Sequence, residues 1–174
     1  MDDAEGEVAG MTHVSLFTGI GGLDLSAEWS GFETVLQVER DDYCRKVLAK
    51  HWPEVPRIDD VREVHEDERW IRPTVVSGGV PCQPASAAGK RGGDKDDRWL
   101  WPEFMRVVRE LRPRYIVAEN VSGLLSLDAG LAFENLLSEM ECAGYEVLPL
   151  HYPAAGVGAP HKRDRVFIVA NYNG

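Results

Sequence analysis

The chain has 174 residues, of which 44% are hydrophobic, and a formal net charge of −10. This length and apolar content suffice to bury a core without disulfides and exclude wholesale disorder. No apolar run reaches the roughly 18 residues of a membrane span, and the acidic start MDDAEGEVAG lacks the apolar stretch of a signal peptide. We expect one domain over residues 12–174, preceded by an acidic disordered tail over residues 1–11, and no contact with a membrane.

The acidic excess lies in the first part of the chain. Residues 1–70 hold 7 basic and 17 acidic residues, whereas residues 71–174 hold 12 of each. This distribution excludes a bulk basic patch and predicts that any polyanion meets the second part of the chain. The cysteines Cys44, Cys82 and Cys142 form no C-x-x-C pair. Their spacing favours reduced thiols and argues against a metal site.

Short apolar runs rich in β-branched residues alternate with helical patterns along the chain. The predicted strands cover residues 13–17, 34–38, 57–58, 74–77, 115–118, 145–150 and 165–170. The predicted helices cover residues 23–29, 41–51, 99–111 and 131–143. This alternation indicates an α/β fold with a doubly wound, largely parallel sheet and helices on both faces. Ligands of such sheets bind at the carboxyl ends of the strands.

A glycine-rich turn, Phe17-Thr18-Gly19-Ile20-Gly21-Gly22, follows the first predicted strand. Glycines let the backbone approach a ligand closely, and the next helix would point its N-terminal amides at that ligand. Glu39 ends the second strand, 20 residues after Gly19, as an acid that accepts hydrogen bonds from ribose would. Asp60, after the short third strand, is placed to meet an adenine amino group. These residues predict a nucleoside site, and the surrounding acids favour a cationic cofactor; the alternative is a turn whose glycines serve only packing.

A proline-flanked cysteine lies in the segment GGVPCQP, directly after an apolar strand. A nucleophilic thiolate needs an accessible loop of this kind and a positive local field. Side chains that could supply the field are Lys90, Arg91, Arg98, Arg163 and Arg165. Cys82 is therefore a candidate nucleophile. The segment 85–98 is typical of a loop that closes over a substrate, and the alternative is a solvated surface loop.

Glu119 and Asn120 end the strand YIVA. A carboxyl group at a strand's carboxyl end can transfer a proton to a substrate, although it can also cap the following turn. In an extended segment, Arg163 and Arg165 would point to one side with Asp164 opposite. Two guanidinium groups on one side suit a phosphate or a carboxylate, and the alternative is a solvated strand edge.

Six segments, taken in order, resemble the successive motifs of the DNA (cytosine-5) methyltransferase family. They are SLFTGIGGLDL, VERDDYC, DDVREV, GGVPCQPAS, AENVSGLL and GAPHKRDRVFIVA, and the resemblance spans about residues 12–170. It implies the Rossmann-like sheet of S-adenosylmethionine-dependent methyltransferases, mostly parallel with an antiparallel strand near the C-terminus. It also implies methyl transfer from S-adenosylmethionine to C5 of a cytosine flipped out of duplex DNA.

The resemblance assigns catalytic roles to four residues. Cys82 resembles the nucleophile that adds to C6 of cytosine, and Glu119 resembles the acid that engages N3 and the exocyclic amino group. Arg165 resembles the residue that holds O2 of the base, and Arg163 its neighbour that orients Glu119 or a phosphate. Three further residues are implied in the substrate loop: Gln83, Ser86 and Asn120, the last as its support.

The resemblance also implies a cofactor site and no metal. The residues expected to bind S-adenosylmethionine are Phe17, Gly19, Gly21, Gly22, Glu39, Asp60 and Pro81. Within this set, Phe17 would lie against the adenine, Glu39 would hold the ribose and Asp60 would contact the adenine.

Two positions depart from the family pattern: Ala85 stands where the motif usually has Phe in Pro-Phe-Ser, and His161 stands where Gln is usual. The family's target-recognition domain and last motif would follow Gly174, so we expect a partner chain that supplies target recognition. The expected location is the cytoplasm of a bacterium or a phage-infected host. Alternatives are an RNA cytosine-5 methyltransferase, a subunit of a split enzyme, a non-catalytic cofactor-binding module and a redox thiol protein.

Overall fold

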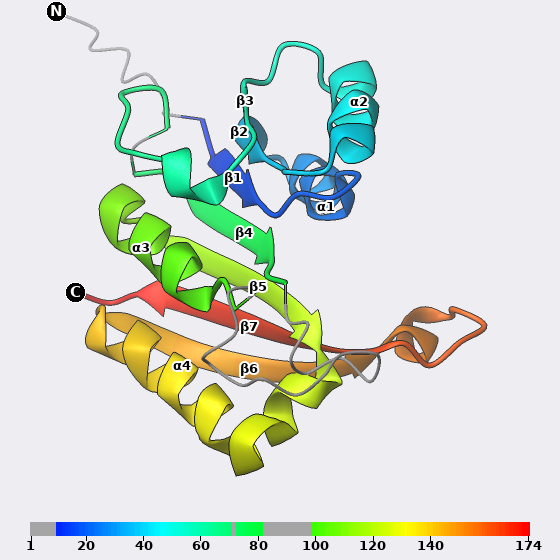
Figure 1. Cartoon of the computed structure of the whole chain (residues 1–174), viewed down its shortest axis with the longest axis vertical. Coiled ribbons are helices and arrows are strands. Elements are labelled where there is room, and N and C mark those ends of the chain that lie inside the picture. Colours follow the sequence, from blue (N-terminus) through cyan, green and yellow to red (C-terminus); the bar gives the residue numbers. More distant parts are fainter. Residues whose placement is uncertain (1–9, 71, 82–98) are drawn as a thin grey trace, which may run out of the picture.

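The computed structural model describes residues 10–70, 72–81 and 99–174, and in these ranges a single twisted sheet is flanked by helices (Figure 1). The strands are β1 (Thr12–Leu16), β2 (Glu33–Val38), β3 (Arg57–Ile58), β4 (Val75–Gly79), β5 (Tyr115–Val121), β6 (Tyr145–Pro153) and β7 (Asp164–Tyr172). Their order across the sheet is β3-β2-β1-β4-β5-β7-β6.

The direction of the strands confirms the predicted fold class. The pairs β1–β2, β2–β3, β1–β4 and β4–β5 are parallel, and β7 is antiparallel to both β5 and β6. The chain moves outward from β1 through β2 to β3 and then returns to the other side of β1 with β4. The reversal places a crevice between the carboxyl ends of β1 and β4, where doubly wound sheets bind their ligands.

Within the described ranges, the strands are connected by the α-helices α1 (Gly22–Trp29), α2 (Asp42–His51), α3 (Trp101–Leu111) and α4 (Leu131–Cys142). The side chain of Asp41 caps α2 by accepting a hydrogen bond from the amide of Cys44 at 2.9 Å. Gly144, with φ of 92°, follows α4 in the left-handed conformation that commonly ends helices. Pro102 lies in the first turn of α3, so this helix begins later than its apolar spacing predicts.

Side chains alternate across the strands, and this alternation shows which helix covers which face. Ser15 of β1 donates a hydrogen bond to Asp24 of α1, whereas a Cβ at Gly78 of β4 would meet the Phe104 ring of α3. Because Gly78 pairs with Leu16, α1 and α3 lie on opposite faces of the sheet. The core between the sheet and α3 includes the fully buried Val14, Leu16, Val76, Phe104, Met105 and Ile116.

None of the helices in the described ranges is long and apolar enough to span a bilayer. The same part of the chain contains no group of three or more His, Cys, Asp or Glu side chains that could hold a metal ion.

Candidate functional site

The glycine turn after β1 is fastened to the end of β2 by Glu39. The amide of Gly19 donates to Glu39 Oε2 at 2.7 Å, and the amide of Asp41 donates to Oε1 at 2.7 Å. Gly19 has φ of 59° and Gly21 has φ of 90°. A Cβ at Gly21 would lie 2.5 Å from the Trp52 ring, so this position requires glycine. The Glu39 carboxylate thus fixes the position of the glycine turn after β1 relative to the carboxyl end of β2.

Beneath this turn lies a buried polar cluster that the sequence analysis did not identify. Asp24 of α1 is fully buried and accepts from Ser15 Oγ at 2.7 Å and from Gln37 Nε2 at 2.8 Å. Burial raises the pKa of the Asp24 carboxyl. Polar residues inside the apolar runs of β1 and β2 are the signal that could have revealed it. The cluster joins α1 to both strands and so positions the glycine turn.

A cavity of about 430 Å³ opens at the carboxyl ends of β1, β2 and β4. Four residues predicted to bind the cofactor line it: Phe17, Glu39, Asp60 and Pro81. The other lining residues are Val38, Arg40, Asp59, Val61, Arg62, Gly79 and Leu100. Gly19 is linked to this wall through its hydrogen bond to Glu39, whereas Gly21 and Gly22 lie at the start of α1 and do not line the cavity.

The cavity has the chemistry of a nucleoside site. Its volume lies in the range of roughly 300–1,000 Å³ that is usual for ligand pockets. The carboxylates of Glu39 and Asp60 accept hydrogen bonds from hydroxyl and amino groups, and the Phe17 ring offers a stacking surface. Asp60 also accepts from the amide of Arg62 at 3.0 Å, which orients its carboxylate. The residues present therefore fit the adenosine part of S-adenosylmethionine.

Glu119 lies next to this cavity and is paired with Arg165. Arg165 Nε is 2.6 Å from Glu119 Oε1, and the two side chains retain exposed fractions of 21% and 26%. Glu119 of β5 also pairs with Gly79 of β4, and a Cβ at Gly79 would lie 3.6 Å from Glu119 Oε2. Since Gly79 belongs to the cavity wall, the carboxylate borders the cavity on the β5 side.

Asn120 connects the end of β5 to the segment after β4. Its Nδ2 donates to the carbonyl of Val80 at 3.0 Å, and its Oδ1 accepts from the amide of Val121 at 2.9 Å. Asn120 is buried, so the bond is shielded from water. Val80 comes two residues before Cys82 in the sequence. This contact fits the expected role of Asn120 as a support for the segment that contains Cys82.

The two arginines do not form the side-by-side pair that an extended segment predicts. Strand β7 begins at Asp164, and Arg163 before it has φ of 38° and is exposed. The extended alternation therefore does not reach Arg163. Arg165 is the residue that contacts Glu119, where the resemblance also implied a role for Arg163 in orienting this acid.

Cys82, Gln83 and Ser86 lie outside the described residues, as do Lys90, Arg91 and Arg98. The described residues thus include those predicted for the cofactor and the predicted acid Glu119, but not the predicted nucleophile. Pro81, in the cavity wall, is the neighbour of Cys82 in the sequence.

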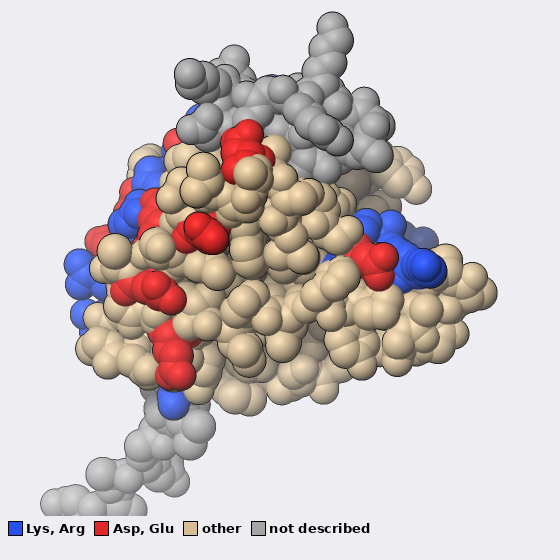
Figure 2. All heavy atoms as spheres, turned by 90° about the horizontal axis from the view of Figure 1, so that it is seen from below, with Lys and Arg blue, Asp and Glu red and all other residues tan. Residues whose placement is uncertain are grey.

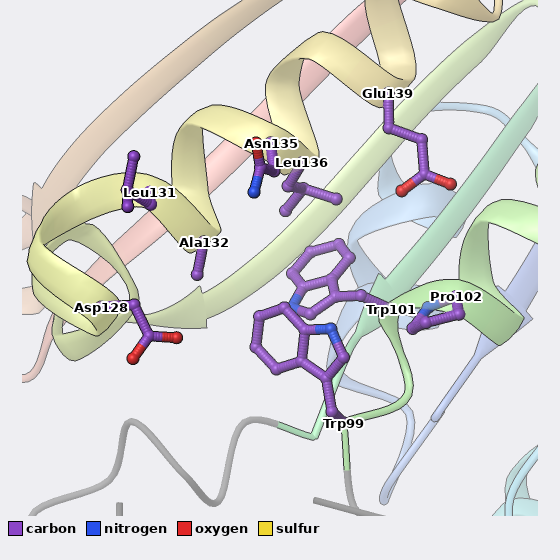
Figure 3. Close-up of a pocket in the computed structure, with 9 residues that line it drawn as sticks. All are labelled: Trp99, Trp101, Pro102, Asp128, Leu131, Ala132, Asn135, Leu136 and Glu139. Atoms are coloured by element: carbon purple, nitrogen blue, oxygen red, sulfur yellow. The ribbon is translucent and has the colours of Figure 1, made fainter. Parts of the chain in front are cut away.

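A further cavity of about 480 Å³ lies between the start of α3 and the helix α4 (Figure 3). Trp99 and Trp101 form one wall, and Asp128, Leu131 and Asn135 contribute to the other. No residue predicted to act in catalysis or cofactor binding lines this cavity.

Comparison with known proteins identifies relatives over nearly the whole chain. The family of C-5 cytosine-specific DNA methylases matches residues 11–174. The Type II methyltransferase M.AquIA of Picosynechococcus is 38% identical over 91% of this chain and 71% of its own length. M.Eco47II of Escherichia coli is 38% identical over 93% of this chain but only 40% of its own length. The chain therefore spans less than half of some of its relatives.

Solved structures show the same fold. A prophage-encoded Escherichia coli protein described as a DNA modification methyltransferase superposes with a TM-score of 0.77 at 28% identity, over 93% of this chain and 47% of that protein. The Spodoptera frugiperda DNMT2 superposes with a TM-score of 0.73 at 24% identity, over 94% of this chain and 50% of that protein.

Proposed function

Because the chain belongs to the family of C-5 cytosine-specific DNA methylases, we propose that it methylates C5 of cytosine in duplex DNA with S-adenosylmethionine. One observation carries the proposal: the Glu119–Arg165 pair borders the cavity that Glu39 and Asp60 line. An acid for the base and a nucleoside pocket thus share one edge of the sheet, as a transfer between two bound molecules requires.

In the proposed reaction, the Cys82 thiolate adds to C6 of the flipped cytosine and forms an Sγ–C6 bond. Glu119 holds a proton at N3, so the negative charge that addition places on the ring is neutralised. Arg165 keeps Glu119 in place, and further N–H donors of its guanidinium would hold O2 of the base. C5 of the adduct would then take the methyl group, with S-adenosylhomocysteine as the leaving group. Loss of the C5 proton to water and breakage of the Sγ–C6 bond, which restores the Cys82 thiolate, would release 5-methylcytosine, and the proton at N3 would return to Glu119.

The cofactor, when bound, supplies an electrophilic methyl group. Phe17, Glu39, Asp60 and Pro81 would hold its adenosine part, which fits the donors and acceptors of the cavity wall. Asn120 would act as a positioning residue, because its bond to Val80 restrains the backbone just before Cys82.

We also propose that a partner chain supplies target recognition. The chain spans only 40% of M.Eco47II and 38% of M.PspPI, so these relatives carry polypeptide that has no counterpart in the match. The names of the relatives support a role in restriction–modification. With DNA as its substrate, the protein would work in the cytoplasm of a bacterium or a phage-infected host.

The deciding experiment is methyl transfer from labelled S-adenosylmethionine to unmethylated duplex DNA, with RNA assayed in parallel. Products are identified as nucleosides by mass spectrometry. The wild type is compared with Cys82→Ala, and with Cys142→Ala as a control at an exposed cysteine on α4. We expect 5-methylcytosine in DNA from the wild type and the control, and none from Cys82→Ala.

Label in RNA alone would reassign the substrate. Methyl transfer retained by Cys82→Ala would refute the assignment of Cys82 as the nucleophile. Cofactor binding without transfer to either nucleic acid, by the chain assayed alone, would show either that transfer requires the recognition subunit or that the chain is a binding module; transfer restored by an added recognition subunit would exclude the binding module.

A further inference from the structure

The cavity between α3 and α4, the tryptophan cavity, has a volume of about 480 Å³, which is typical of ligand pockets. Trp99 and Trp101 line it, whereas Leu100 between them lines the cavity proposed for the cofactor. One backbone segment thus separates the two cavities, and they share no lining residue. The tryptophan cavity is therefore a distinct candidate site that the proposed methyl transfer does not use.

The wall of the tryptophan cavity contains a buried hydrogen-bond donor. Trp101 is 1% exposed, and its Nε1 has no hydrogen-bond partner among the described residues. In Figure 3 this nitrogen lies on the edge of the ring that is turned towards Ala132 and Asp128. The ring is held in place by Phe104, against which it packs edge-on with the ring centroids 5.5 Å apart. A buried N–H group without a partner costs free energy, and an acceptor atom of a ligand would remove that cost.

Two indole rings and two leucines form the apolar part of the wall. The ring of Trp99 is half-buried, and its centroid lies 6.4 Å from that of Trp101 at an interplanar angle of 56°. Leu136 of α4 is buried, whereas Leu131 is 59% exposed. Aromatic side chains prefer to stack on other flat aromatic rings or to meet their edges. The wall therefore favours a ligand with a planar ring.

The segment Ser122–Gly130 and the helix α4 contribute polar groups on the other side of the cavity. The carboxylate of Asp128 accepts hydrogen bonds, and the amide of Asn135 both donates and accepts them. Asp128 and Ala129 have φ of 50° and 57°, a conformation that is costly for residues other than glycine. A strained turn thus carries an acceptor opposite the indole rings.

The charge around the tryptophan cavity opposes the binding of anions. Asp128 and Glu139 line the cavity, and Glu139 is paired with Arg109. None of the described residues that line it is a Lys or an Arg. Figure 2, seen from the side of α4 and β6, shows scattered Asp and Glu side chains on this surface, with Lys and Arg towards its edges. A phosphate or a carboxylate would be repelled here, whereas an uncharged ligand would not.

We propose that the tryptophan cavity binds an uncharged nitrogen heterocycle that carries an amino group, which is the chemistry of a free nucleobase or nucleoside. A ring nitrogen would accept the hydrogen bond from Trp101 Nε1, and the ring would stack on Trp99. The amino group would donate to Asp128. Asn135 offers the adjacent donor and acceptor with which asparagine pairs with the edge of a base.

Two other kinds of ligand fit the cavity less well. An organic cation such as tetramethylammonium is attracted by tryptophan rings and carboxylates, but it has no acceptor atom for Trp101 Nε1. A base within a nucleic-acid strand would bring phosphates towards Asp128 and Glu139, where like charges oppose binding. The charge of the ligand and its acceptor atoms therefore distinguish the proposal from these alternatives.

The probe is 2-aminopurine riboside, an uncharged amino heterocycle whose fluorescence falls when its ring stacks on another ring. Fluorescence titration measures its dissociation constant with the 174-residue chain, and NMR follows the indole N–H signals of the five tryptophans. The signal that is missing in Trp101→Phe identifies Trp101. We expect the probe to lose fluorescence and the Trp101 signal to move downfield. Purine riboside, which lacks the amino group, and the 5′-monophosphate of the probe should bind more weakly.

Variants of the wall separate the buried donor from general packing. Trp101→Phe keeps an aromatic ring without the donor, and Asp128→Asn removes a charge where the left-handed backbone tolerates asparagine. Each should weaken binding of the probe by about fivefold, the effect of one hydrogen bond. Trp29→Phe, at a residue of α1 that is 78% exposed, is the matched control and should bind as the wild type does. Asp60→Ala should do the same, because it alters the other cavity.

An unchanged Trp101 signal at saturating probe would overturn the proposal, as would equal affinity for the wild type, Trp101→Phe and Asp128→Asn when circular dichroism shows all three to be folded. Binding that Asp60→Ala abolishes would place the probe in the other cavity. Equal binding of purine riboside would contradict the role of the amino group.

Two further results would assign the cavity to another ligand and would also overturn the proposal. Tighter binding of the 5′-monophosphate, or of the same base within an oligonucleotide, would assign it to nucleic acid. A shift of the Trp101 signal by tetramethylammonium but not by the riboside would assign it to organic cations. Because no methyl transfer is measured, each of these results is independent of the proposed function.

Discussion

Arg165 and Glu119 are diagonal neighbours across the antiparallel pair of β7 and β5, with Nε of the arginine 2.6 Å from Oε1 of the acid. Val121 pairs directly with Arg165, and Phe167 pairs with Glu119. The two charged side chains therefore emerge on the same face, two residues apart in register. A rigid strand pair, rather than a loop, orients the carboxylate that borders the cavity.

Replacement of this acid should separate catalysis from cofactor binding. We expect Glu119→Gln to slow single-turnover methyl transfer by about 10²–10⁴-fold, because the neutral amide cannot donate the proton. Cofactor affinity should stay nearly constant, since Glu119 borders the cavity but is not among the residues that line it. Glu134→Gln, at an exposed residue of α4, is the control. Near-normal rates for Glu119→Gln would exclude the role of proton donor.

Loss of the Glu39 carboxylate should weaken cofactor binding. This group accepts bonds from the amides of Gly19 and Asp41 and also lines the cavity. We expect Glu39→Ala to raise the cofactor dissociation constant by roughly tenfold or more, the effect of about 1.5–3 kcal/mol for bonds to a charged group. Glu39→Gln keeps one acceptor oxygen, so its cofactor dissociation constant should lie between those of the wild type and Glu39→Ala. Calorimetry provides the affinities, and an unchanged constant for Glu39→Ala would contradict the assignment.

Hydrogen exchange gives an independent check on Glu39. The amides of Gly19 and Asp41 should exchange faster in Glu39→Ala than in the wild type, because each loses its acceptor. Slow exchange in the variant would show that other contacts hold the turn.

Two adjacent glycines should differ sharply in their tolerance of a methyl group. Gly21→Ala would place Cβ 2.5 Å from the Trp52 ring at φ of 90°, so we expect it to lower the free energy of unfolding by about 1–3 kcal/mol. Gly22→Ala meets no atom within 4 Å in the first turn of α1 and should be neutral or stabilising. Chemical denaturation measures both, and equal stabilities would refute the steric argument.

Stability should fall in weak acid because of His13. This residue is fully buried between Thr34 and Ser77, at 2.8 Å and 2.7 Å from their hydroxyl oxygens. Burial lowers the pKa of His13 to about 4 from its usual 6.5. Below pH 6.5, His13 is therefore protonated in the unfolded chain, whereas in the native state it stays neutral until the pH approaches about 4. The contribution of neutral His13 to the free energy of unfolding is complete above pH 6.5, and it decreases as the pH falls from 6.5 towards 4.

The loss should reach about 3 kcal/mol at the lower end of that window. Denaturant unfolding at several pH values measures it, with His13→Gln as the comparison. The variant should lose this part of the pH dependence, even though it is less stable overall. An equal slope in both proteins between pH 4 and 6.5 would show that other groups are responsible.

The sequence by itself determined the order of strands and helices and the edge of the sheet at which the candidate site lies. Apolar runs, glycines and prolines act locally, so strands ending near Gly19, Glu39 and Glu119 were predictable from their neighbours in the chain. The parallel arrangement followed from the alternation of strands and helices. Because carboxyl ends of parallel strands meet at one edge, Phe17, Glu39 and Asp60, which line the cavity, were predictable as a group.

Only the tertiary structure decided which groups meet. Arg165 contacts Glu119 because of the register between β5 and β7, which no local pattern encodes. The burial of Asp24 among Ser15 and Gln37 depends on how α1 packs over two strands. Register and helix placement follow from packing between segments far apart in sequence, whereas periodicity reports only on neighbours along the chain.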